Sequence, residues 1–132
     1  MKAEELRIGN WYNSVKWQRP VILDITDIAE LYHRCDGAYD NIPVDEMIEP
    51  IPLTEEWLLK FWFSCYKKNR YGQDVYYDPY FRFMIIKDGN NWMFFAFNEL
   101  DGGEWFLRNL EYVHQLQNLY FALTNTELEI NK

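Results

Sequence analysis

The sequence has few cysteines and no pattern that marks export or membrane insertion. Its two cysteines, Cys35 and Cys65, form no CxxC unit, and 132 residues with 48% hydrophobic side chains can build a core without disulfides. The segment from Met1 to Leu6 lacks the apolar stretch of a signal peptide. No apolar run approaches the roughly 20 residues that cross a bilayer. We therefore expect free, partly buried thiols, no membrane span and a cytoplasmic protein.

The common signatures of catalysis and cofactor binding are also missing. The sequence contains no P-loop, no GxGxxG and no GxSxG. His33 and Cys35 form an HxC pair, but only Cys65 and His114 remain to complete a zinc site, and their spacing matches no zinc framework. These patterns predict no catalytic residue, no metal site and no cofactor, which favours a protein that is not an enzyme.

Positive charge is scarce, because 13 Lys and Arg against 21 Asp and Glu leave a net charge of -8. Proteins that bind nucleic acid normally carry a basic footprint. The basic cluster of Lys67, Lys68 and Arg70 is instead predicted to be a hairpin tip in solvent. Direct nucleic-acid binding is therefore not expected. An acidic surface can also imitate DNA, so an acidic DNA mimic or anti-defence protein is an alternative hypothesis.

Aromatic residues, by contrast, are abundant and make up 19% of the chain. Aromatic side chains favour strands and bury large apolar areas. In SH3-like barrels, aromatics near the loop ends form grooves for extended peptides. The candidate groove residues in the N-terminal third are Trp11, Tyr12, Trp17, Tyr32 and Tyr39. Packing in the core and at its rim is the alternative role. In a groove, the nearby acids Asp24, Asp27 and Asp36 would favour a basic or proline-containing ligand.

The N-terminal third is expected to consist of short strands separated by turns. A helical turn over Val44 to Glu46 is predicted before the last strand. The expected strands are Ile8 to Tyr12, Pro20 to Ile28, Leu31 to Cys35 and Met47 to Ile51. This order resembles a small SH3-like barrel, so residues 1–52 are predicted to form a small barrel-like unit.

Residues 53–132 are predicted to form an antiparallel sheet covered by two helices. Thr54 is a good N-cap, and the apolar spacing that follows predicts a helix from Thr54 to Trp62. A second amphipathic helix is expected from Leu110 to Thr124, closed by Asn125 in the left-handed conformation. The polar side of this second helix is expected to carry His114, Gln115, Gln117 and Asn118.

Strands are expected between the two helices, over residues 63–68, 75–78, 81–87, 91–97 and 105–108. The sequence Asp88-Gly89-Asn90-Asn91 predicts a hairpin between two of them. The chain is thus predicted to be an α+β protein. Its joint lies at Pro50-Ile-Pro52, which either separates two units or is a loop within one compact domain.

Three stretches together resemble a family of small proteins from Bacteroides and related gut bacteria. They cover residues 1–11, 48–61 and 112–123. Genes of that family often lie near phage-like or mobile DNA, and the family has no assigned activity. The resemblance therefore implies a bacterial cytoplasmic protein of a mobile-element context and no functional residue. The family more often has glycine where this chain has Trp62 and Asn125. Asparagine tolerates the left-handed conformation that glycine adopts, whereas tryptophan is a larger change.

These observations predict a binding or accessory module that works through contacts with another protein or with further copies of itself. The acidic mimic is the first alternative. The second is a small enzyme whose carboxylate or histidine site matches no familiar motif.

Overall fold

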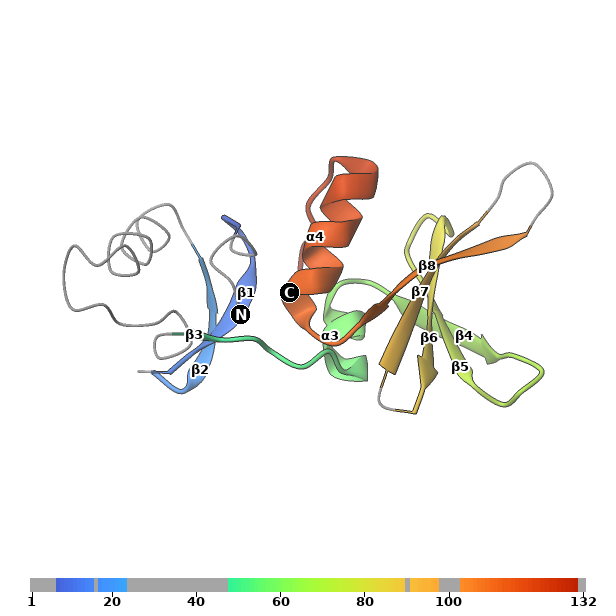
Figure 1. The fold of residues 1–132 in the computed structure, drawn as a ribbon, viewed down its shortest axis with the longest axis horizontal. Helices are drawn as coiled ribbons and strands as arrows, with labels where there is room; N and C mark the ends of the chain where they lie inside the picture. The colour runs from blue at the N-terminus through green and yellow to red at the C-terminus, as the bar shows by residue number, and fades with distance from the viewer. Residues whose placement is uncertain (1–6, 16, 24–47, 90, 98–102, 131–132) are drawn as a thin grey trace. The chain divides into compact units, whose positions relative to one another are not determined.

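A computed structural model describes residues 7–15, 17–23, 48–89, 91–97 and 103–130 (Figure 1). These residues form two antiparallel sheets, of three and five strands, and two helices, which is an α+β fold. The chain divides into two compact units. Unit 1 consists of Met1–Pro52 and Tyr112–Glu127, and unit 2 of Leu53–Glu111 and Leu128–Lys132. Within the described residues, no helix is long and apolar enough to span a membrane.

Unit 1 contains the three-stranded sheet, with the strand order β2-β1-β3. Its strands are β1 (Trp11–Ser14), β2 (Arg19–Ile22) and β3 (Ile48–Glu49). The described strands of unit 1 do not close into a barrel, so the SH3-like architecture is not confirmed. The expected strand Leu31 to Cys35 and the helical turn Val44 to Glu46 lie outside the described residues.

Strand β1 begins three residues later than predicted, because the chain turns at Gly9. Gly9 has a φ of 92°, and Asn10 N donates to Arg7 O across the turn (3.1 Å). Glycine reaches this conformation at no steric cost. The predicted strand Ile8 to Tyr12 therefore splits into a turn and the first two residues of β1.

The C-terminal helix α4 (Val113–Thr124) belongs to unit 1, where it contacts β1. Asn125 ends the helix in the predicted left-handed conformation, with a φ of 56°, and its N–H donates to Phe121 O (2.7 Å). The prediction placed both helices with the second sheet. The structure instead groups α4 with the three-stranded sheet.

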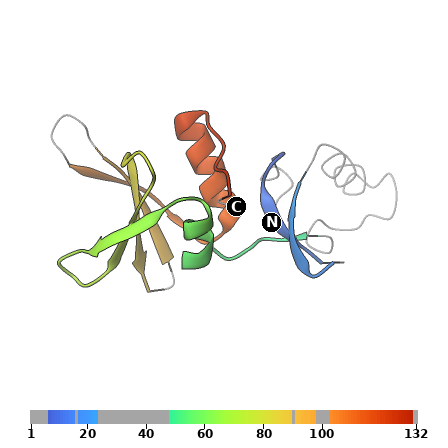
Figure 2. The same cartoon turned by 180° about the vertical axis from the view of Figure 1, so that it is seen from behind.

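Unit 2 is an antiparallel meander in which each strand pairs with the next along the chain (Figure 2). Its strands are β4 (Ser64–Lys68), β5 (Asp74–Tyr77), β6 (Phe83–Asp88), β7 (Asn91–Phe97) and β8 (Glu104–Leu110). Asp88 pairs with Asn91, which confirms the predicted hairpin. β6 is the central strand of this sheet.

Helix α3 (Glu55–Lys60) covers one face of this sheet, which we call the helix-covered face. Thr54 caps the helix, since its Oγ1 accepts from Trp57 N (3.4 Å). Trp92 Nε1 donates to Leu53 O (2.8 Å), which holds the start of the helix segment against β7. Burial raises the pKa of the Tyr76 hydroxyl above its ordinary value, and a hydrogen bond to the Glu55 carboxylate raises that pKa further. These two hydrogen bonds attach α3 to β5 and the residues just before α3 to β7.

The chain leaves α3 through a residue in the left-handed region. Trp62 has a φ of 70°, and its side chain is 51% exposed. In this region the Cβ of an L-residue approaches the following carbonyl oxygen, which costs about 1–2 kcal/mol. Trp62 and Asn125 are the two positions where the resemblance predicts glycine, and both have a positive φ. The backbone at both positions therefore has the geometry that glycine favours.

We expect Trp62→Gly to raise the free energy of unfolding of unit 2 by about 0.5–1 kcal/mol. The gain is smaller than the full strain because glycine also makes the unfolded chain more flexible. Urea unfolding would measure this change. Trp62→Ala is the control, since it removes the same ring but keeps the Cβ. An equal gain in the alanine variant would assign the effect to the ring and would contradict backbone strain at this position.

Candidate interaction surface

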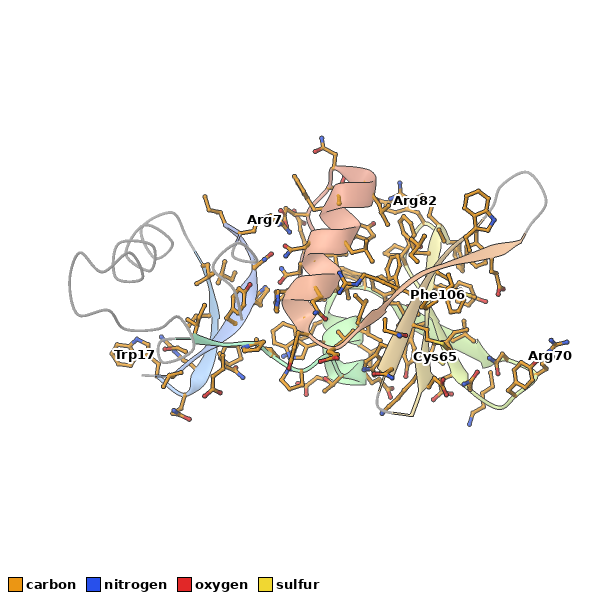
Figure 3. All side chains as sticks on the ribbon, viewed as in Figure 1. Arg7, Trp17, Cys65, Arg70, Arg82 and Phe106 are labelled. Carbon is orange, nitrogen blue, oxygen red and sulfur yellow. The ribbon has the colours of Figure 1, made fainter. Side chains whose placement is uncertain are left out.

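The aromatic residues expected to form a peptide groove have different environments in unit 1. Tyr12 is fully buried, so it has no exposed surface to offer a ligand, and Trp11 is half-buried. Trp17 is 62% exposed in the turn between β1 and β2 (Figure 3). Tyr32 and Tyr39 lie outside the described residues, as do Asp24, Asp27 and Asp36. The groove as a whole therefore stays a prediction.

Two polar side chains of α4 are buried, although they were predicted to face solvent. His114 is 1% exposed, and its ring stacks on Tyr12 and on Tyr112 with centroid distances of 4.9 and 5.9 Å. Gln117 is fully buried; its Oε1 accepts from Trp11 N (2.8 Å) and its Nε2 donates to Gly9 O (3.1 Å). The amide of Gln117 thus supplies hydrogen bonds that the backbone before β1 needs.

A polar cluster around Arg7 joins the same two segments of unit 1 (Figure 3). Arg7 Nε donates to Asn118 Oδ1 (2.8 Å), and Arg7 forms an ion pair with Glu127. The guanidinium also lies over the ring of Phe121, with 4.6 Å to its centroid. These groups satisfy one another, so the cluster explains how the N-terminal segment is held to α4 and offers no ligand site.

The described residues also contain no group of three or more His, Cys, Asp or Glu side chains that could hold a metal ion. The HxC pair of His33 and Cys35 lies outside them. Cys65 is exposed and not partly buried as predicted. Asp78 is buried at 1% exposure, and its carboxylate accepts from Arg82 N (2.7 Å) and Phe83 N (2.8 Å). Its role is therefore to form the turn between β5 and β6.

The second face of the five-stranded sheet, which we call the open face, carries aromatic side chains opposite to α3. Its centre is the buried cluster Val75, Met84 and Ile86. The partly buried side chains packed against this cluster are Tyr77, Met93, Phe95 and Phe97. The rings contact one another in pairs, with Tyr77 stacked on Phe97 at 5.9 Å.

Two further rings continue the open face outward and are more exposed. Phe81 lies 5.6 Å from the ring of Tyr77, and Phe106 makes an edge contact with Phe95 at 5.5 Å. Phe81 is 55% exposed and Phe106 is 53% exposed. The open face therefore reaches strand β8 through Phe106, which Figure 3 labels.

The two edges of this sheet, β4 and β8, differ in chemistry. Edge strands are usually protected from pairing with other chains by charge, by bulges or by short length. β4 has a bulge and ends in Lys67 and Lys68. β8 also has a bulge, but its residues Trp105, Phe106 and Leu107 are 63%, 53% and 37% exposed. β8 is thus an edge that presents three consecutive large apolar side chains to solvent.

The hydrogen bonds of β7 show which backbone groups of β8 point outward. Successive residues of a strand direct their N–H and C=O alternately to the two neighbouring strands. Phe97 N donates to Arg82 O on the β6 side of the sheet (3.1 Å). Phe97 and Phe95 therefore direct their backbone groups to β6, and Ala96 directs its groups to β8.

Ala96 is paired with Trp105, so the backbone of Trp105 faces β7. Its neighbours Glu104 and Phe106 consequently direct their N–H and C=O groups to the outer edge of β8. The strand order ends at β8, so none of the described strands pairs with these groups. Among the described strands, the outer edge of β8 thus has outward N–H and C=O groups that no strand pairs with, and it also has exposed aromatic side chains.

No family model, curated protein or solved structure matches this chain. The resemblance to the Bacteroides family accordingly stays a prediction.

The sequence interpretation treated β8 only as sheet material and missed this surface. A usable signal was present in Trp105-Phe106-Leu107, because a strand with one buried face alternates between apolar and polar residues. Three consecutive large apolar residues break that alternation. Local sequence could not show, however, that this strand lies at the edge of the sheet.

Proposed function

We propose that the protein is a non-enzymatic binding module that contacts another protein chain through the outer edge of β8 and the open face. The observation that carries this proposal is the exposure of Trp105, Phe106 and Leu107 on an edge strand. Trp105 is paired with Ala96 on the helix-covered face, whereas Phe106 contacts Phe95 on the open face, so both sides of this edge carry an exposed ring. Exposed apolar surface of this kind commonly marks interaction sites. A partner that covers this edge would bury the three side chains and pair the outward backbone groups.

The mode of binding that suits these features is strand addition. An extended segment that joins a sheet edge gains affinity from main-chain hydrogen bonds, and alternate side chains supply specificity. Glu104 and Phe106 offer the main-chain groups, and the exposed rings of Phe106 and Trp105 offer the apolar contacts. Tryptophan is also among the residues that most often dominate binding energy at interfaces.

Affinity capture with matched variants tests the proposal. The tagged protein, Phe106→Lys and Tyr71→Lys would each be incubated with lysate of the native host, and bound proteins would be identified by mass spectrometry. Tyr71 is the control because it is an aromatic residue of unit 2 with 71% exposure, away from β8. We expect a partner, which can include untagged copies of the chain, to be retained by the control and lost with Phe106→Lys. Equal recovery with all three baits would contradict the proposal.

A further inference from the structure

We infer that the partner at this surface is a second copy of the same chain, held by antiparallel pairing of two β8 strands about a two-fold axis. The inference rests on the proposed function, because it names the occupant of the same surface. Two-fold dimers are the commonest protein oligomers, and their interfaces use one patch twice. An edge strand fits this symmetry, since an antiparallel copy presents the same hydrogen-bonding groups in the reverse direction.

The positions of the outward backbone groups define the register of the pairing. Glu104 and Phe106 point outward and are separated by one residue, Trp105, whose backbone faces β7. A two-fold axis at Trp105 places Glu104 of each copy opposite Phe106 of the other. Each such pair exchanges both of its N–H···O=C bonds. This register therefore satisfies all the outward groups of Glu104 and Phe106 in both copies.

The bulge in β8 limits the pairing to this part of the strand. Phe94 is paired with Arg108, and Phe95 with Phe106, so Leu107 is the extra residue. A bulge bends the strand and interrupts the regular alternation. Alternation is intact over Glu104, Trp105 and Phe106, and it is interrupted immediately afterwards. The register centred on Trp105 is thus the one that uses only the regular portion of the edge.

The side chains of this portion are compatible with their symmetry mates. Trp105 meets Trp105 of the second copy in a pair without mutual hydrogen bonds, the position where cross-strand side chains approach most closely. Aromatic pairs are favourable there. On the other face of the strand, Phe106 lies opposite Glu104 of the second copy, and the bulged residue Leu107 takes no part in the regular pairing. The pairing thus covers Trp105, which is the most exposed side chain of the three.

The charge distribution favours an identical partner at this edge. Unit 1 has 5 basic and 11 acidic residues (5 - 11 = -6), whereas unit 2 has 8 and 10 (8 - 10 = -2). β8 has one charge of each sign, Glu104 and Arg108. A strongly basic partner would be attracted to unit 1 instead of this nearly neutral edge. Two copies that meet through β8 bring together the less charged unit of each chain. The two chains still repel each other because both are negatively charged, so salt should strengthen the dimer by screening this repulsion.

The test measures the association state of the full chain and the exchange of its backbone amides. Sedimentation velocity over a wide concentration range, at low and at moderate salt, should show a monomer–dimer equilibrium that salt shifts toward the dimer. Trp105→Lys should weaken the dimer about tenfold or more, because this register places the two lysines directly opposite each other, where like charges are destabilising. Tyr71→Lys should leave the dimer unchanged. Circular dichroism of each variant confirms that it is folded.

Hydrogen exchange of the unmodified protein supplies the readout that is specific to strand pairing. As the concentration rises, the amides of Glu104 and Phe106 should become protected, while the Trp105 amide, already directed to β7, should change little. A dimer without this pattern, or one insensitive to Trp105→Lys, would overturn pairing through β8. A monomer at every concentration would also overturn the inference. In that last case, a different partner lost specifically with Phe106→Lys would leave the proposed function standing.

Discussion

Replacing Gln117 by alanine is expected to lower the free energy of unfolding of unit 1 by about 2–4 kcal/mol. The fully buried amide of Gln117 bonds Trp11 N at 2.8 Å and Gly9 O at 3.1 Å. Truncation leaves both backbone groups without that partner, and a buried unsatisfied polar group costs more than a hydrogen bond gains. It also removes side-chain volume between α4 and the segment that leads into β1.

Urea unfolding would measure the loss in Gln117→Ala, and hydrogen exchange at the Trp11 amide would report the missing acceptor directly. Gln115→Ala is the matched control on the same helix. Gln115 is half-buried, and its Oε1 accepts from Tyr112 N at the helix start (3.1 Å). Loss of such a cap costs about 0.5–2 kcal/mol. If both variants lost the same stability, the special role assigned to Gln117 would be refuted.

Asp78→Ala is expected to destabilise unit 2 by about 2–4 kcal/mol. The carboxylate accepts from the backbone N–H groups of Arg82 (2.7 Å) and Phe83 (2.8 Å), and more weakly from Tyr80 (3.4 Å). Hydrogen bonds to a charged acceptor are stronger than neutral ones. Asp78 N also donates to Phe83 O (3.3 Å), so this residue closes the β5–β6 turn from both its backbone and its side chain.

Asp78→Asn separates the geometry of this turn from its charge. The amide oxygen of asparagine can accept at the position of Oδ1, so we expect roughly half of the loss seen with alanine. Denaturant unfolding would measure both variants, and exchange of the Phe83 amide would report the turn itself. If asparagine proved as destabilising as alanine, the negative charge rather than the acceptor geometry would be the main contribution. No loss in either variant would contradict the role of Asp78.

The parts of the fold that sequence predicted well are those determined by nearby residues. Thr54 and the apolar spacing after it predicted α3, and Asp88-Gly89-Asn90-Asn91 predicted the hairpin between β6 and β7. Asn125 was also correctly assigned to the left-handed end of α4. In each case the cap, the turn chemistry or the periodicity lies within a few residues of the feature that it specifies.

The burial of Gln117 and His114 could not be predicted in the same way. Amide and imidazole side chains on a helix are usually solvated, and their periodicity here matched a polar face. The partner of Gln117 at Trp11 lies 106 residues away in the sequence. Only the assembled unit 1 shows that this polar face of α4 meets backbone groups that need hydrogen bonds. Long-range pairing of this kind leaves no local signal.

The arrangement of unit 1 has a consequence for the order of events during synthesis. β1 leaves the ribosome first, whereas Gln117 follows about 100 residues later, which at bacterial and eukaryotic elongation rates takes about 5–20 s. The segment Leu53–Glu111 of unit 2 is made in that interval, and its meander needs only strands that are neighbours in the chain. Until α4 is synthesised, the backbone groups of Gly9 and Trp11 therefore lack the Gln117 amide and remain hydrated. Unit 1 can complete its fold only after α4 has emerged.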